Sequence, residues 1–105
     1  MTVQGKKLGI LVSTAPAQPN FGHGLSLAQA ALAQGADVYL YCIDEAVQGL
    51  ADPRLDRLCA RGLKLFACGY SAQRRHIAPD ARVTLSGLST LSDLIAATDR
   101  FVAFN

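Results

Sequence analysis

Cysteines are the residues of this chain with the clearest capacity for covalent chemistry, because a thiolate is a strong nucleophile at neutral pH. Cys68 follows the apolar run 63–67 and precedes residues of good helical propensity, so we expect it where a strand ends and a helix begins. The positive end of that helix, together with Arg74 and Arg75, would favour the thiolate. Cys68 is therefore the candidate catalytic residue, and a small buried cysteine without reactivity is the alternative.

Two neighbours of Cys68 are expected to support it. Gly69 would permit an unusual backbone conformation and close approach of a partner, and Ser71 would cap the following helix. Arg74 and Arg75 complete the supporting set, either by stabilising the anion or by docking an acidic partner.

The other two cysteines are weaker candidates. Cys42 also ends an apolar run, but Asp44 and Glu45 follow it, and nearby carboxylates would raise the pKa of its thiol. It is the secondary candidate. Cys59 shares the apolar side of a predicted helix with leucines, which is typical of a core residue.

The two histidines, His23 and His76, have no second ligand at a metal-binding spacing, so we expect no metal site. A hydrolytic pair of Cys68 and His76 has no readable third member. The segment 22–27 resembles a dinucleotide-binding fingerprint, but its third glycine is replaced by Leu27. We interpret these glycines as a flexible entry into a helix.

Five apolar segments alternate with helical patterns and must position these residues. Strands are predicted at 6–12, 36–42, 63–67, 83–85 and 100–104. Helices are predicted at 22–34, from Pro53 to before Gly62, at 71–75, and at 89–97 with Ser89 or Thr90 as the cap. This alternation predicts an α/β fold, a three-layer α/β/α sandwich with a five-stranded parallel sheet. Reactive groups then collect at the carboxyl ends of the strands.

Composition limits the remaining possibilities. The 105 residues suffice for a single domain, and 50% of them are apolar while only 17% are charged. Such a chain must hide much surface, in a covered sheet or a subunit interface. The net charge of +2 is too small to support direct nucleic-acid binding, so we expect none. No segment is long and apolar enough for a membrane span. An odd cysteine count without a signal sequence predicts a reducing, cytoplasmic setting.

The segment from Cys68 to Ile77, which reads CGYSAQRRHI, resembles the active segment of the DsrE/TusD-like sulfur-relay family. In that family a cysteine, a turn of small residues, an arginine and an aliphatic residue follow one another, here as Cys68, Arg75 and Ile77. The similarity extends to the helix ending at 35–38 and to the tail 88–104. The family often has glycine where this chain has His76, and a glycine-containing segment where it has residues 44–47.

The resemblance implies a DsrE-like domain over residues 1–105 and a sulfur-relay role without a cofactor. Cys68 would carry sulfane sulfur as a persulfide between donor and acceptor proteins, and the chain would form a homo-oligomer, a trimer or a hexamer. Some members keep the fold without the reactive cysteine. The alternative is therefore a non-catalytic oligomeric subunit that serves in binding or as a scaffold.

Overall fold

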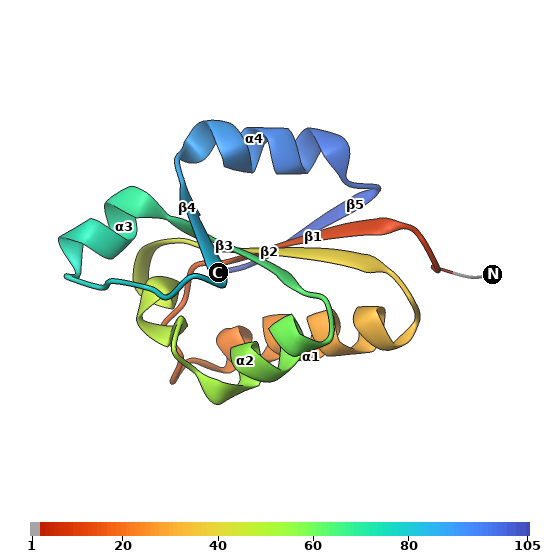
Figure 1. Ribbon diagram of the computed structural model, residues 1–105, viewed down its shortest axis with the longest axis horizontal. Coiled ribbons are helices and arrows are strands. Elements are labelled where there is room, and N and C mark those ends of the chain that lie inside the picture. Colours follow the sequence, from red (N-terminus) through yellow and green to blue (C-terminus); the bar gives the residue numbers. More distant parts are fainter. Residues whose placement is uncertain (1–2) are drawn as a thin grey trace.

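The computed structural model describes residues 3–105 as five strands that alternate with helices (Figure 1). The strands are β1 (Lys7–Val12), β2 (Asp37–Cys42), β3 (Lys64–Cys68), β4 (Val83–Ser86) and β5 (Arg100–Phe104). The helices are α1 (Pro19–Ala33), α2 (Pro53–Ala60), α3 (Gly69–Arg74) and α4 (Leu88–Ala97), and a 3-10 helix, η1 (Asp44–Gly49), follows β2.

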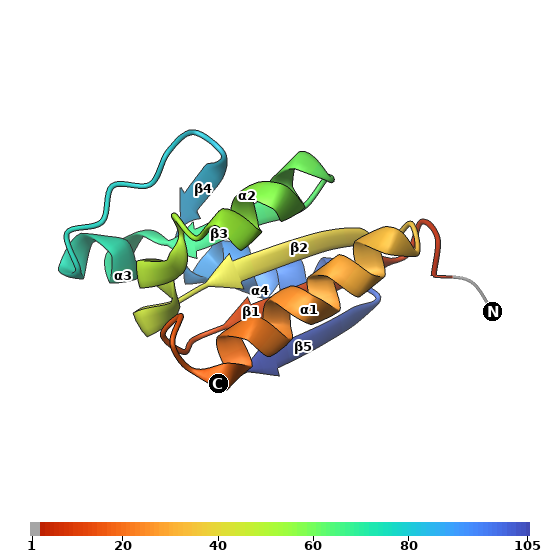
Figure 2. The same ribbon diagram turned by 90° about the horizontal axis from the view of Figure 1, so that it is seen from below.

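The strands form one sheet in the order β4-β3-β2-β1-β5, and every neighbouring pair is parallel. Helices α1 and α2 cover one face, α4 lies over the other, and α3 lies beyond the carboxyl end of β3 (Figures 1 and 2). The predicted α/β fold with a five-stranded parallel sheet is confirmed. Within residues 3–105, no helix is both long and apolar enough to cross a bilayer.

The hydrophobic core lies between the sheet and the layer of α1 and α2. Side chains alternate along a strand, and the strand register places Ile10, Leu40 and Leu65 in one row on this face. All three are buried, and Phe21 of α1 and Leu55 of α2 pack in the same cluster. This face of the sheet is therefore a closed interior that fixes where the carboxyl ends of the strands lie.

Two glycines allow α1 to approach the sheet closely. The helix begins at Pro19, earlier than predicted, so Gly22 and Gly24 lie inside it. A Cβ on Gly24 would come within 2.9 Å of the Val12 Cγ2 atom, which is closer than side chains pack. The interpretation of these glycines as a flexible helix entry was therefore wrong, since close packing of a helix on a strand requires at least Gly24.

The other face of the sheet is less well covered. None of the residues of α4 is buried, and Leu88 and Ile95 are 63% and 50% exposed. The residue before the helix is Gly87, which has no side chain to cap it, so the predicted cap at Ser89 or Thr90 was wrong. Helix α4 does form the second helical layer. It buries less apolar surface than the composition led us to expect.

Helix α3 ends in a Schellman motif, in which two backbone amides after the helix bond back to its last turn. The Ile77 amide donates to the Ala72 carbonyl at 2.9 Å, and the His76 amide donates to the Gln73 carbonyl at 3.1 Å. His76 has a φ of 55°, the left-handed conformation that this position requires. Glycine adopts it without the steric cost that a Cβ imposes.

Replacing His76 by glycine should therefore stabilise the fold. We expect His76→Gly to raise the free energy of unfolding by ~0.5–1 kcal/mol, since relief of the left-handed strain outweighs the greater chain entropy of glycine. The matched control is His23→Gly, inside α1, which should lower it by about 0.5 kcal/mol. Urea denaturation measures both, and a destabilised His76→Gly protein would contradict the strain.

Candidate functional site

Cys68 is the last residue of β3 and the N-cap of α3, as the sequence predicts. Its Sγ atom accepts a hydrogen bond from the backbone N–H of Ser71 at 3.4 Å. A donor directed at the sulfur stabilises a thiolate more than a neutral thiol, because the anion is the stronger acceptor. The side chain is only 5% exposed, so the sulfur lies beneath the surface at the carboxyl edge of the sheet.

Ser71 joins the two loops that form this edge. Its side chain is buried, and its Oγ atom accepts a hydrogen bond from the backbone N–H of Asp44 at 3.0 Å. Asp44 adopts a φ of 53°, the left-handed conformation, where the chain leaves β2 for η1. Ser71 thus fastens the start of η1 to α3 while its own amide contacts the Cys68 sulfur. The predicted role of a capping serine is filled by the Cys68 side chain instead.

Tyr41 is a part of the site that the sequence reasoning missed. Its hydroxyl donates to the carbonyl oxygens of Gly87 at 3.1 Å and Ser86 at 3.3 Å. Burial raises the pKa of the Tyr41 phenol, and the neighbouring Cys68 thiol raises it further. Strand alternation supplies a signal for it, because Tyr41 and Cys68 are on the same face of neighbouring strands.

Both arginines after Cys68 are engaged with other groups. The Arg75 guanidinium forms an ion pair with Glu45, with Nε at 3.0 Å from the carboxylate, and donates to the Ser71 carbonyl at 3.2 Å. Arg74 stacks on the ring of Tyr70 and donates to its hydroxyl at 3.1 Å. The hydrogen bond to the Cys68 sulfur comes from a backbone amide. Arg75 joins the end of α3 to η1 through Glu45, whereas the contacts of Arg74 with Tyr70 stay within α3.

Gly69 does not take the unusual backbone conformation that we expected of it. Among residues 3–105 the glycines with a left-handed φ are Gly5, Gly35 and Gly62. A Cβ on Gly69 would lie 3.8 Å from the Ser86 carbonyl oxygen, an ordinary contact. The conformational reason given for Gly69 was therefore wrong.

The secondary candidate, Cys42, lies in the core. Complete burial raises the pKa of its thiol to about 12, and the Cys59 thiol contributes to the same shift. At neutral pH the thiolate of Cys42 is therefore hardly populated. Cys59 is partly exposed on α2, with its sulfur 4.0 Å from an Arg82 guanidinium nitrogen. Cys42 ends β2 at the same carboxyl edge as Cys68, but its side chain lies on the opposite face of the sheet, in the core. Cys59 lies on α2, away from this edge.

No group of three or more potential metal ligands occurs among the described residues. His23 and His76 lie in α1 and after α3. The His23 Nδ1 atom is 3.0 Å from the Asn20 amide oxygen, so the His23 ring has a hydrogen-bond partner within α1.

The raised pKa of Cys42 makes the stability of the protein depend on alkaline pH. In the unfolded chain this thiol ionises near its ordinary value of 9.0, whereas in the fold it stays protonated up to about 12. The stability that the buried, protonated Cys42 thiol contributes to the fold is therefore complete below pH 9 and is lost as the pH rises toward 12. We expect the free energy of unfolding to fall over this range, and to fall less steeply in Cys42→Ala.

Chemical denaturation at a series of pH values measures these slopes. Cys59→Ala is the control and should keep most of the slope of the original protein, because burial is the larger cause of the raised pKa of Cys42 and stays in place. Equal slopes in the original protein and Cys42→Ala would show that Cys42 ionises freely in the fold.

Comparison with known proteins adds the family. The solved structure described as the ychN protein from E. coli has a TM-score of 0.85 and 21% sequence identity, and the alignment covers 94% of this chain and 99% of that one. A comparison with curated protein sequences finds no match. The family model for DsrE/DsrF-like proteins matches residues 6–104, nearly the whole chain. This chain therefore belongs to the DsrE/DsrF-like family, and the predicted family is confirmed.

Proposed function

We propose that this protein carries sulfane sulfur as a persulfide on Cys68 and transfers it between cysteines of donor and acceptor proteins in the reducing cytoplasm. Membership of the DsrE/DsrF-like family supports a role of the sulfur-relay type. The observation that carries the assignment to Cys68 is the hydrogen bond from the Ser71 amide to its sulfur at the start of α3. No cofactor enters the proposal, since thiol exchange needs none.

The transfer is an exchange between a thiolate and a persulfide. The Cys68 thiolate attacks the outer sulfur of a donor persulfide, so that one S–S bond forms as the donor's S–S bond breaks. The donor leaves as a thiolate, and the terminal sulfur now belongs to Cys68. In the second half an acceptor thiolate attacks that sulfur, and Cys68 returns to the thiolate. Electrons balance in both steps without an external oxidant.

The surroundings of Cys68 fit the needs of a carrier. At 5% exposure Cys68 is shielded from bulk water, so a partner cysteine would have to reach it from the carboxyl edge of the sheet. Tyr70 is 66% exposed at the carboxyl edge of the sheet, with the Arg74 guanidinium stacked on it. Exposed aromatic and arginine side chains are frequent anchors at protein interfaces. We assign Arg74 to partner docking, and Arg75 to positioning of α3 through Glu45.

Sulfur loading tests the assignment. The protein, Cys68→Ala and Cys59→Ala would each be incubated with a protein persulfide donor, and their intact masses recorded. We expect one added sulfur atom in the original protein and in Cys59→Ala, and none in Cys68→Ala. Equal loading of Cys68→Ala would reject Cys68 as the carrier. Thermal unfolding of the three proteins confirms that each is folded.

We further propose that the chain forms a homo-oligomer, a trimer or a hexamer, through the face that α4 leaves open. Leu88 and Ile95 on this helix are exposed, and Phe66 and Tyr39 on the sheet below are only partly buried. Apolar surface of this kind favours association. Cys68 lies on the same face of the sheet as Phe66, so an interface here would bring a second copy near the thiol.

A charge placed on α4 should break the oligomer. We expect Ile95→Asp to reduce the mass in solution to that of a monomer, because a buried carboxylate without a partner is costly. Leu85→Asp, at a residue 48% exposed on the opposite face of the sheet, is the matched control and should leave the oligomer intact. Light scattering during gel filtration measures both, and a monomeric original protein would contradict the proposal.

The competing function is a non-catalytic oligomeric subunit that serves as a scaffold. The low exposure of Cys68 and the engagement of both arginines elsewhere are the observations in its favour. The two functions differ in thiol reactivity. A carrier requires that Cys68 reacts in the folded protein faster than the buried Cys42, whereas in a scaffold both thiols react only after unfolding.

A further inference from the structure

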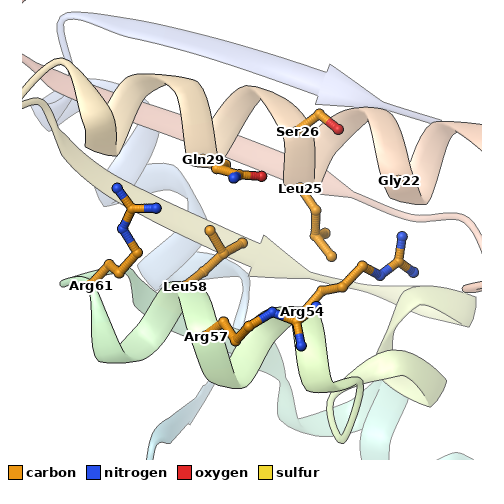
Figure 3. A pocket seen from close by; sticks show the side chains of 8 residues that line it. All are labelled: Gly22, Leu25, Ser26, Gln29, Arg54, Arg57, Leu58 and Arg61. Carbon is orange, nitrogen blue, oxygen red and sulfur yellow. The ribbon is translucent and has the colours of Figure 1, made fainter.

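The layer of α1 and α2 contains a pocket that the proposed sulfur chemistry does not use. Its volume is about 290 Å³, at the lower end of the range for small-molecule sites. Figure 3 shows that it lies between the two helices. Because α1 and α2 cover the face of the sheet opposite to α4, this pocket is separate from Cys68 (Figure 1). Three arginines line it: Arg54 and Arg57 of α2, and Arg61, the C-cap of that helix.

The three guanidinium groups follow one another along the pocket. Arg61 lies seven positions after Arg54, which corresponds to about 10 Å along the helix axis. In Figure 3 the Arg54 guanidinium reaches toward Gly22 and the Arg61 guanidinium lies at the other end. A Cβ on Gly22 would be 3.4 Å from the Arg54 Nη1 atom, so the missing side chain leaves that nitrogen room.

Most of this positive charge has no counterion within the described residues. Asp52 neutralises Arg54 through Nε and Nη2, which leaves Nη1 on the pocket side. Arg57 and Arg61 form no hydrogen bond or ion pair of their side chains within residues 3–105. The only other carboxylate of α2, Asp56, pairs with Arg82.

The opposite wall supplies neutral hydrogen-bonding groups. None of the 15 residues of α1 is Asp, Glu, Lys or Arg. Ser26 and Gln29 of α1 line the pocket, and Figure 3 shows Leu25 of α1 and Leu58 of α2 extending into the space between the two helices. An alternative role of Arg57 and Arg61 is to stabilise the carbonyl end of α2 by their positive charge. That role would not explain why the two side chains line a pocket that is shared with α1.

We propose that this pocket binds a phosphoryl group of a small molecule. Guanidinium groups bind phosphate through paired hydrogen bonds, and residues four apart on a helix face can converge on one anion. Arg57 and Arg61 would hold the phosphoryl oxygens, the free Nη1 of Arg54 would add a third contact, and Ser26 and Gln29 would donate or accept at the opposite side. A bound dianion also relieves the repulsion between like charges on α2.

Two probes test the site and distinguish an inorganic phosphate ligand from an organic one. Inorganic pyrophosphate and ribose 5-phosphate would be titrated at low ionic strength, and the backbone amide resonances of Gly22, Ser26 and Gln29 followed by NMR. We expect saturable shifts at these amides with a dissociation constant of about 1 mM or lower. Tighter binding of ribose 5-phosphate would identify an organic phosphate as the ligand, and tighter binding of pyrophosphate an inorganic one.

Charge-matched variants show whether the pocket itself is responsible. The double variant Arg57→Gln, Arg61→Gln should weaken binding by about tenfold or more, since two charged contacts are lost. The control double variant Lys6→Gln, Arg100→Gln loses the same charge outside the pocket and should change binding by less than about twofold. Absence of saturation at about 10 mM, shifts centred on other residues, or equal weakening in both double variants would overturn the proposal.

Discussion

The junction at Ser71 is the constraint on which the candidate site depends. The Ser71 amide donates to the Cys68 sulfur, and its hydroxyl accepts from the Asp44 amide. One buried residue therefore sets both the surroundings of the thiol and the distance between the loops that follow β2 and β3. The Arg75–Glu45 ion pair joins the same two loops from the surface. Exposed ion pairs contribute ~0.2–1 kcal/mol, so the buried contacts at Ser71 determine the geometry and the ion pair reinforces it.

The two faces of the sheet have different roles. Toward α1 and α2 the face is a closed core, in which Gly24 allows a helix to pack directly on β1. Toward α4 the helix has no buried residue. The buried side chains of the closed face fix the positions of the strands, and with them the carboxyl edge that carries Cys68. The α4 side carries exposed apolar side chains such as Leu88 and Ile95, and Tyr41 and Cys68 lie on that side of the sheet.

Much of the fold was predictable from the sequence, because strands buried between helices are continuous apolar runs. All five strands, and the helix that begins at Pro53, follow from this pattern. The 3-10 helix η1 did not, since it depends on a left-handed Asp44 held by a serine 27 residues away. Helix periodicity also could not reveal that Gly24 meets Val12, because that contact depends on how closely two elements pack.

Within the site, the position of Cys68 was predictable and the partners of its neighbours were not. A strand followed by a helix is a local pattern, and it placed Cys68 at the N-cap of α3. Arg75, in contrast, pairs with Glu45, 30 residues earlier in the chain. Local reasoning assigned its charge to the nearest anion in sequence, whereas the fold offers a closer one in space. His76 shows the same limit, since its left-handed conformation reflects the hydrogen bonds that end α3.

Mapping the added sulfur in the original protein tests the central claim most directly. After reaction with a persulfide donor, the protein would be alkylated, digested and analysed by mass spectrometry, so that all three cysteines compete within one molecule. We predict that the extra sulfur occurs on the peptide that contains Cys68, while Cys42 stays unmodified because burial raises the pKa of its thiol to about 12. Sulfur found mainly on Cys59, or spread equally over the three peptides, would contradict the assignment of Cys68 as the carrier.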